Sequence, residues 1–231
     1  MPPALLVTAD GSPTLVRDDG HAYRSRYGAE AEVRHVFLEG SGVGARLRAG
    51  QATSVLEVGF GTGLSAFVTL SEATHADAPC HVVSLEADPV PAEVIATLDY
   101  GTHLGLPDLE ARFLRPYAVL VTEAQGAHAF AFTPLHTLTL VIGDARMADL
   151  PGASFDAIYL DAFAPAVNPD LYAAPFLARL FAALKPGGRL ATFVAQGAFR
   201  RALTSVGFAV EKRPGGPGKR EMTVAVRPAR T

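Results

Sequence analysis

Short apolar runs recur along the chain and alternate with stretches long enough for helices. The runs that predict strands are SVLEVGF, HVVSLEA, LTLVIGD, AIYLDAF, GRLATFV, FAVEKR and MTVAVRP. Helix-length intervals between most of the earlier runs predict a parallel sheet covered on both faces. A Gly/Pro loop separates the last two runs and predicts a closing antiparallel hairpin. The pattern therefore predicts an α/β protein with a seven-stranded, mainly parallel sheet.

The intervals predict helices in GLSAFVTLSEAT, PVPAEVIATLDYG and PDLYAAPFLARLFAALKPGG. In the last, Pro186 and the glycines after it predict the end of the helix. Residues 1–50 precede the first predicted strand, and we expect them to form an N-terminal extension that packs on the core. Residues 51–231 are expected to form the core, within a single domain overall.

Composition is that of one folded domain, because 231 residues with 49% hydrophobic and 19% charged residues suffice for a stable core. The single cysteine, Cys80, excludes an internal disulfide and a cysteine zinc cluster and fits a reducing cytoplasm. The histidines lack metal-ligand spacing, so no metal is predicted. The N-terminus does not resemble a signal peptide, and no apolar run reaches the length of a membrane span, so we expect a cytoplasmic protein without a membrane partner.

Charge is distributed unevenly along the chain. Residues 196–231 carry a formal charge of +6 and residues 1–195 carry -9, which gives a net charge of -3. A basic end of this kind is compatible with a face for a polyanion such as RNA, and equally with a solvated tail.

The segment LEVGFGTGLS runs from an apolar strand pattern through glycines into a helix pattern. Glycines lack Cβ atoms and let the backbone approach a ligand, although tight strand-to-helix packing also requires them. No Gly-Lys-Ser/Thr follows, which argues against a Walker nucleotide site. The dinucleotide-binding pattern is G-x-G-x-x-G. Its third glycine is replaced by Leu64 when the pattern starts at Gly59, and by Ala66 when it starts at Gly61. A nucleoside without a pyrophosphate fits better, and a dinucleotide stays open.

Two acidic residues end the next predicted strands. Glu86 lies about twenty residues after the glycines, where a carboxylate can accept hydrogen bonds from both ribose hydroxyls. Asp144 lies where an adenine amino group would need an acceptor, although it also suits a helix cap. The carboxyl ends of parallel strands meet at one crevice, so these motifs predict one cofactor site. The residues assigned to it are Glu57, Gly59, Phe60, Gly61, Thr62, Gly63, Leu64, Glu86, Asp144 and Ala145.

This combination resembles the class I S-adenosylmethionine-dependent methyltransferases, whose Rossmann-like sheet ends in the same hairpin. A narrower resemblance, to the MnmC-type methyltransferase domain, rests on YLDAFAPAVNPDLY together with EVGFGTGLS, PGGRLATFVAQGAFRRALTSVGF, GKREM and YRSRYGAEAEVRHVFLEG. It extends from about Tyr23 onward and is weakest over residues 100–136. The resemblance implies S-adenosylmethionine as the cofactor and the anticodon stem-loop of tRNA as the partner. The implied reaction converts 5-aminomethyl-2-thiouridine to 5-methylaminomethyl-2-thiouridine at the wobble position.

The resemblance also assigns Asp161 as the catalytic residue. A carboxylate after the fourth predicted strand can orient a substrate amine and accept its proton, although an aspartate there can also cap the following loop. The resemblance suggests that an apolar wall and a nearby amide contact the base, and that basic residues contact phosphates. The residues assigned to substrate binding are Phe163, Pro165, Asn168, Tyr172, Arg200, Arg201, Lys219 and Arg220.

The sequence departs from the family pattern at Ala162, Tyr172 and Ser65, where glycine, tryptophan and asparagine are usual. The family's fused flavin domain has no counterpart in this sequence. We therefore expect a stand-alone methyltransferase that depends on a separate upstream wobble-uridine modification enzyme. Two alternatives stay open, namely methyl transfer to a small-molecule amine or another nucleoside, and a non-catalytic module that binds the cofactor or RNA.

Overall fold

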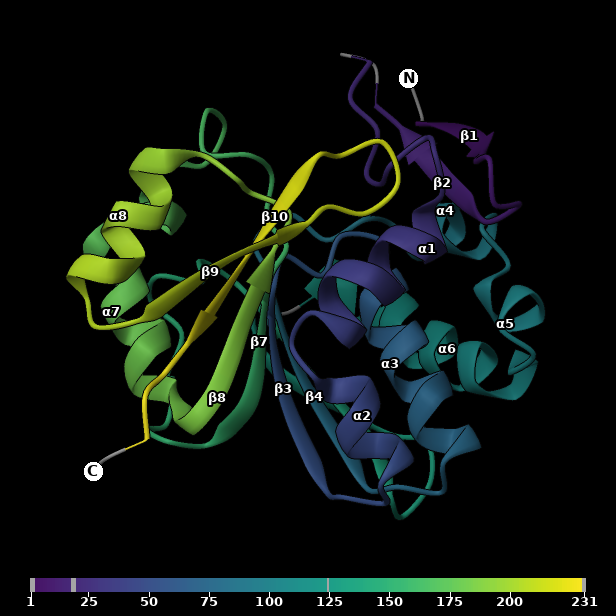
Figure 1. Ribbon diagram of the computed structural model, residues 1–231. Coiled ribbons are helices and arrows are strands. Elements are labelled where there is room, and N and C mark those ends of the chain that lie inside the picture. The colour runs from purple at the N-terminus through teal and green to yellow at the C-terminus, as the bar shows by residue number, and fades with distance from the viewer. Residues whose placement is uncertain (1–2, 18–19, 124, 230–231) are drawn as a thin grey trace.

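The computed structural model describes residues 3–17, 20–123 and 125–229 and is organised around one large sheet (Figure 1). The strands of this sheet are β3 (Thr53–Val58), β4 (Cys80–Glu86), β5 (Gly126–Ala131), β6 (His136–Ile142), β7 (Phe155–Leu160), β8 (Leu184–Thr192), β9 (Ala209–Pro214) and β10 (Glu221–Val226). The sheet is eight-stranded, with the order β5-β6-β4-β3-β7-β8-β10-β9. Strands β6, β4, β3, β7 and β8 are parallel, and β10 runs antiparallel to β8 and β9.

This arrangement confirms the predicted α/β fold with a closing antiparallel hairpin, and every apolar run that predicts a strand forms one. The predicted number of seven strands is wrong by one, because β5 adds an antiparallel edge strand beside β6. Within β5 only Phe130 is buried. An edge strand that covers so little core carries too weak an apolar pattern to be recognised in the sequence.

The helices that follow the first core strand are α3 (Leu64–His75), α4 (Ala92–Ala96), α5 (Tyr100–His103), α6 (Pro107–Glu123), α7 (Ala174–Ala183) and α8 (Gly197–Ser205), with a 3-10 turn η2 (Pro169–Tyr172). The second predicted helix is divided between α4 and α5 at Asp99, which has a left-handed backbone with φ of 46°. Helix α7 ends before Pro186, because Leu184 is extended and pairs with Phe155 in the sheet. No helix in the described part of the chain has the length and apolar character needed to cross a bilayer.

Successive residues of the central strand β3 face opposite layers of the core, as the two-residue period of a strand requires. Val55 belongs to the hydrophobic layer under α3 and α6, and Leu56 belongs to the layer under α7 and α8. Figure 1 shows these helix groups on the two sides of the sheet. Both faces are therefore covered, and only the strand ends are open to ligands.

The N-terminal segment contributes a hairpin and three short helices to the first of these layers. Its elements are β1 (Ala4–Val7), β2 (Pro13–Val16), α1 (Ala29–Glu32), a π-helix η1 (Val33–Glu39) and α2 (Val43–Arg48). Leu15, Phe37 and Leu47 are buried in the same hydrophobic cluster as Val55. The segment before β3 is therefore part of the core.

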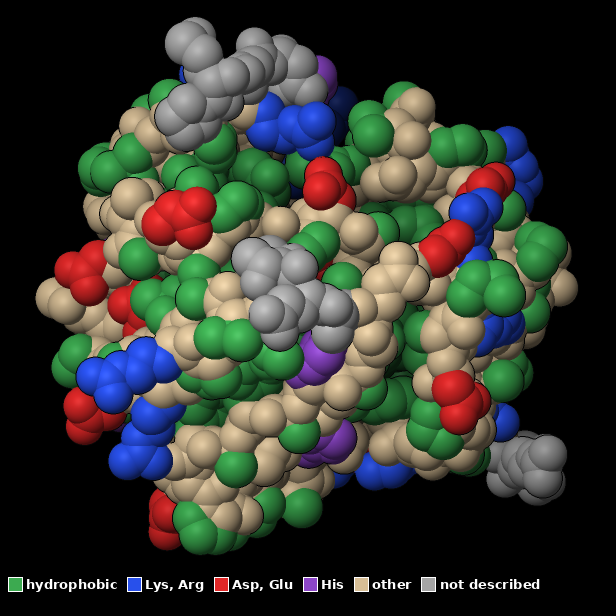
Figure 2. All heavy atoms as spheres, turned by 180° about the vertical axis from the view of Figure 1, so that it is seen from behind, with side chains coloured by type: hydrophobic (Ala, Val, Ile, Leu, Met, Phe, Trp, Pro, Cys, Tyr) green, Lys and Arg blue, Asp and Glu red, His purple; other side chains and the backbone are tan. Residues whose placement is uncertain are grey.

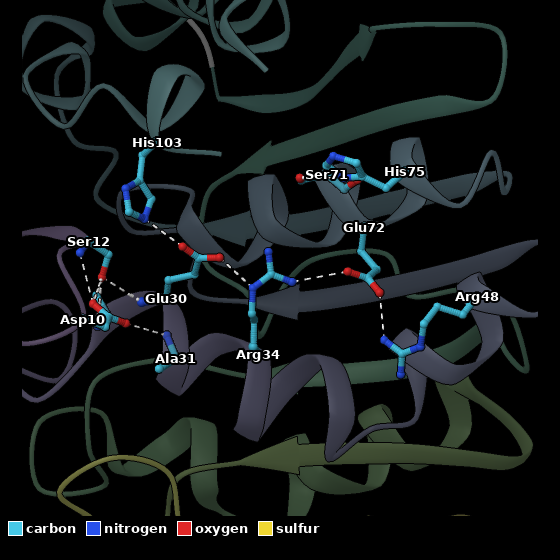
Figure 3. Close-up of polar contacts among 11 residues, drawn as sticks. Asp10, Ser12, Glu30, Ala31, Arg34, Arg48, Ser71, Glu72, His75 and His103 are labelled. Carbon is cyan, nitrogen blue, oxygen red and sulfur yellow. Dashed lines mark hydrogen bonds and ion pairs between the residues drawn. The ribbon is translucent and has the colours of Figure 1, made fainter. Parts of the chain in front are cut away.

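A chain of ion pairs joins the N-terminal helices to α3 and α5 (Figure 3). Arg34 Nε donates to Glu30 at 2.6 Å, and Arg34 Nη1 lies 3.3 Å from Glu72 of α3. Glu72 also accepts a hydrogen bond of 2.7 Å from Arg48 of α2. His103 Nε2 of α5 lies 2.7 Å from Glu30. These contacts add to the apolar packing that fixes the segment over the strand ends.

Candidate functional site

A cleft of about 920 Å³ opens at the carboxyl ends of β3, β4, β6 and β7. Its volume lies in the range of about 300–1,000 Å³ that small-molecule and cofactor sites occupy. Arg17, residues 21–25 and Glu32 of the N-terminal segment contribute to its wall. The predicted site residues that line it are Gly59, Gly61, Thr62, Glu86, Asp144, Ala145, Asp161, Phe163, Asn168 and Lys219.

The glycine loop lies against the segment that follows β7. Gly59 has a φ of +94°, and a Cβ there would lie 3.0 Å from the backbone N and Cα of Ala162 and 3.1 Å from the carbonyl carbon of Asp161. Gly63 has a φ of +86°, and a Cβ there would lie 2.6 Å from the ring of Phe60. Only glycine fits at both positions, so the loop and the predicted catalytic residue are in direct backbone contact.

Glu86 is fixed at the edge of the cleft by two backbone groups. Its Oε2 accepts a hydrogen bond of 2.8 Å from the Gly61 N–H, and its Oε1 accepts one of 2.9 Å from the Asp88 N–H. Burial raises the pKa of Glu86, and these N–H groups oppose that shift. A carboxylate offers about four lone-pair sites, so Glu86 keeps acceptor capacity for the hydroxyls of a ligand.

Asp144 lies in the loop after β6, next to the end of β4 that carries Glu86, and is exposed. Arg146 donates to it through its backbone N–H at 2.9 Å, through Nε at 3.0 Å and through Nη2 at 2.7 Å, and these side-chain and backbone bonds lower the pKa of Asp144. Arg146 also forms an ion pair with Asp170. The loops after β6 and β7 are thus joined close to Ala145, which also lines the cleft.

Asp161 follows β7 directly, and its side chain is only 4% exposed. It forms an ion pair with Arg24, whose Nη2 also donates to Ser65 Oγ at 2.9 Å. Ser65 Oγ in turn donates to Asp161 Oδ2 at 3.2 Å. Burial raises the pKa of Asp161 to about 6, and the guanidinium of Arg24 opposes the shift. This carboxylate therefore titrates just below neutral pH, where a group that exchanges protons is most effective.

Further ionisable groups lie close to Asp161. Glu57 lies buried in β3, accepts a hydrogen bond of 2.5 Å from Ser84, and has a pKa that burial raises to about 8. Lys219 Nζ lies 2.6 Å from Glu32 and 3.9 Å from the ring centroid of Phe193. Among the described residues, no group of three or more His, Cys, Asp or Glu side chains is arranged to hold a metal ion.

Several predicted site residues do not line the cleft. Phe60 is buried against Phe113 and Tyr117, and Leu64 is also buried. Tyr172 is buried and donates its hydroxyl to the Ala162 carbonyl at 2.8 Å. These side chains shape the loops around the cleft from within the core.

The basic residues that were predicted to contact phosphates differ in burial and in position relative to the cleft. Arg200 is buried and bonds Thr223 at 3.0 Å and Glu221 at 2.8 Å, so its guanidinium is used inside the fold. Arg201 and Arg220 are exposed outside the cleft, and Pro165 is partly exposed beside it. Of these basic residues, Lys219 alone is both predicted and part of the cleft wall.

The structure adds residues of the N-terminal segment that motif analysis did not assign to the site. The ring of Tyr23 lies 5.7 Å from that of Phe163, and the guanidinium of Arg17 lies 5.1 Å from the Phe163 ring centroid. Arg24 contacts Asp161. Tyr23 and Arg24 lie in the YRSRYG block that carries part of the family resemblance, which was the available signal.

Comparison with known proteins agrees with this geometry. A family model described as S-adenosyl-L-methionine-dependent methyltransferase matches residues 107–228. A protein of Cupriavidus necator named tRNA 5-methylaminomethyl-2-thiouridine biosynthesis bifunctional protein MnmC is 37% identical over 95% of this chain and 34% of the relative. A protein of the same name from Aromatoleum aromaticum is 37% identical over 96% of this chain and 35% of the relative. The chain spans about a third of the length of these relatives.

Two solved structures share the fold. The crystal structure of MNMC2 from Aquifex aeolicus superposes with a TM-score of 0.73 at 24% identity, over 99% of this chain and 72% of that chain. Spermidine synthase from Thermotoga maritima superposes with a TM-score of 0.57 at 15% identity, over 99% of this chain and 70% of that chain.

Proposed function

Because this chain belongs to the S-adenosyl-L-methionine-dependent methyltransferases, we propose that it methylates the aminomethyl nitrogen of 5-aminomethyl-2-thiouridine at the wobble position of tRNA. The observation that carries the proposal is the contact between the glycine loop at Gly59 and the backbone of Asp161. The loop assigned to the cofactor and the carboxylate assigned to the amine are therefore neighbours in one cleft. Methyl transfer requires the cofactor and the amine to be held this close together. The names of the relatives supply the substrate class.

The residues present fit the cofactor. Gly61 and Thr62 would lie along its methionine part, Glu86 would accept from the ribose hydroxyls, and Asp144 with Ala145 would lie at the adenine. When bound, S-adenosylmethionine supplies a methyl group on a positively charged sulfonium. Glu86 is already oriented by the Gly61 and Asp88 N–H groups, so binding requires little rearrangement there.

Asp161 orients the acceptor amine and takes up its proton. An alkylamine is largely protonated near neutral pH, and only its free lone pair is a nucleophile. A carboxylate with a pKa of about 6 is mostly ionised at pH 7 and can accept that proton. The methyl group passes directly from the sulfonium to the amine, so no covalent enzyme intermediate is needed.

The wall formed by Phe163, Tyr23 and Arg17 suits a base turned out of an RNA loop, because bases stack on aromatic rings and on guanidinium planes. Asn168 lines the same cleft and can hydrogen-bond a base edge.

On the face shown in Figure 2, acidic and basic side chains are interspersed. We assign the phosphate contacts to the exposed residues Arg201 and Arg220. This substrate implies a cytoplasmic location and an upstream enzymatic activity that supplies the aminomethyl nucleoside.

The direct test is incubation with S-adenosylmethionine and tRNA from cells that lack this gene, followed by nucleoside mass spectrometry. We expect 5-aminomethyl-2-thiouridine to be converted to its methylamino form. If the nucleoside is present and unchanged while the cofactor is bound, the tRNA assignment fails, and assays with small-molecule amines come next.

The response to salt separates tRNA from a small substrate. We expect the KM for tRNA to rise several-fold or more as ionic strength increases, because phosphate contacts release counterions. The Kd for S-adenosylmethionine, measured over the same salt series by calorimetry, is the internal control and should change little. A salt-independent KM would argue for a small neutral substrate.

Replacing Glu86 by alanine should weaken S-adenosylmethionine binding by about 10- to 100-fold, because hydrogen bonds to a charged group contribute about 1.5–3 kcal/mol. Calorimetric titration of the cofactor measures the change. The matched control is Glu93→Ala, an exposed glutamate in α4, which should bind as the wild type does. Equal affinity of Glu86→Ala and wild type would remove Glu86 from the cofactor site.

A further inference from the structure

The two oxygens of the Asp161 carboxylate have different surroundings. Arg24 Nη2 contacts Oδ2, and Ser65 Oγ donates to the same atom at 3.2 Å. Within the described part of the chain, Oδ1 takes no hydrogen bond, although Asp161 lines the cleft. One oxygen is therefore committed to the protein, and the other is available to a ligand.

Arg24 is built into the core as firmly as Asp161 is. Its side chain is 6% exposed, and its guanidinium carbon lies 5.8 Å from the ring centroid of Phe37 in η1. The preceding residue, Tyr23, donates its backbone N–H to the Leu15 carbonyl at 2.9 Å, which ties the segment to β2. A buried arginine in this setting has few alternative positions, so it can define the orientation of the carboxylate that it contacts.

Charges around Asp161 are nearly balanced. Arg24 of the N-terminal segment compensates the charge of Asp161. Lys219 compensates the charge of Glu32, which also belongs to that segment. Glu57 of β3 has a pKa of about 8 because it is buried, so it is mostly neutral at pH 7. Tyr172 of η2 is a further titratable neighbour; burial raises its pKa above the usual value, so it stays neutral. Among the described residues, Arg24 makes the largest contribution that opposes the rise in the pKa of Asp161 caused by burial.

We propose that Arg24 is a positioning residue: together with Ser65 it holds Oδ2 of Asp161, so that Oδ1 is the atom that receives the proton of the acceptor amine. The protonated amine and the carboxylate become a neutral amine and a carboxylic acid, and the electron pair of the N–H bond stays on nitrogen as the nucleophilic lone pair. The guanidinium of Arg24 opposes the rise that burial causes in the pKa of Asp161, so the carboxylate is ionised and able to accept a proton before the transfer. The inference rests on the proposed function for the identity of the amine.

The kinetic test compares wild type with Arg24→Gln and Arg24→Lys from about pH 5 to about pH 9. We expect Arg24→Gln to lower kcat at least about 10-fold at pH 7 and to move the acidic limb of the kcat profile to higher pH, because unopposed burial keeps Asp161 protonated. Arg24→Lys retains the charge and should return the limb toward its wild-type position. A purely structural role for Arg24 would lower the amount of active enzyme without moving the limb.

Arg46→Gln is the matched control. Arg46 of α2 lies 3.1 Å from Asp156, at the opposite end of the same strand β7, so this variant breaks an Arg–Asp pair away from the cleft. It should leave the pH profile unchanged. An equal shift in Arg46→Gln and Arg24→Gln would overturn the inference.

A readout that needs no turnover is carbon-13 NMR of labelled aspartate carboxyl groups, with the Asp161 signal assigned from Asp161→Asn. The titration midpoint of Asp161 should be higher in Arg24→Gln than in wild type. Ser65→Ala removes the second contact to Oδ2 and should shift the midpoint in the same direction by less; it serves as the second variant if Arg24→Gln does not fold. Unchanged midpoints in the folded variants would overturn the inference. Failure of wild type to methylate tRNA would overturn the proposed function alone, because the midpoints are measured without substrate.

Discussion

Asp161→Asn should lower kcat for tRNA methylation by about 10²-fold or more while S-adenosylmethionine binding is retained. Asparagine has nearly the same shape and can still accept the hydrogen bond from Ser65, but its amide oxygen is too weak a base to take a proton from the amine. Single-turnover assays with undermodified tRNA measure the rate, and calorimetry measures the affinity for the cofactor.

Loss of the Asp161 charge also leaves Arg24 buried without its partner, which can cost about 3–5 kcal/mol of stability. Rates must therefore be measured at a temperature at which the variant is folded. Asp156→Asn is the matched control, because Asp156 pairs with Arg46 at 3.1 Å and with Lys185 at 2.9 Å at the far end of β7. It should retain the wild-type rate. Wild-type turnover by folded Asp161→Asn would remove Asp161 from the chemistry.

The edge of the fold that we propose binds the cofactor could be predicted from the sequence because its signals are local. Gly59, Glu86 and Asp144 each stand where an apolar strand run stops, and parallel topology alone brings such positions together. All three line the cleft. The strong apolar runs of β3, β7 and β10 also predicted strands from local signals, since most residues of these strands are buried.

The rest depends on contacts between distant parts of the chain, which a single sequence does not show. Arg24 and Asp161 are separated by most of the chain, and the packing of the N-terminal segment against the core brings them together. Arg200 carries a charge that suggests a surface contact, yet its guanidinium lies inside the fold beside Thr223. Strand β5 was missed because it buries a single residue, Phe130. Side-chain direction in these cases is decided by tertiary packing and not by local pattern.

Gly59→Ala should lower the free energy of unfolding by about 2–5 kcal/mol and weaken S-adenosylmethionine binding in the protein that remains folded. Two effects add at this position. A residue with a side chain resists a φ of +94°, and its Cβ would lie 3.0 Å from the Ala162 backbone, which cannot rotate away as a side chain could. Relief of that contact requires the glycine loop and the Asp161 segment to separate. Urea unfolding measures the stability, and calorimetry measures the Kd for the cofactor.

Gly50→Ala isolates the first effect, the cost of a side chain at a positive φ. Gly50 also has a positive φ, +69°, but nothing lies within 4 Å of the position of a Cβ there. This control should lose only the backbone contribution, about 1–2 kcal/mol, and should bind S-adenosylmethionine with wild-type affinity. The difference between the two variants then measures how closely the cofactor loop must approach Asp161. If both variants are equally stable and bind the cofactor equally well, the contact at Gly59 does not constrain the site, and the observation that carries the proposed function is lost.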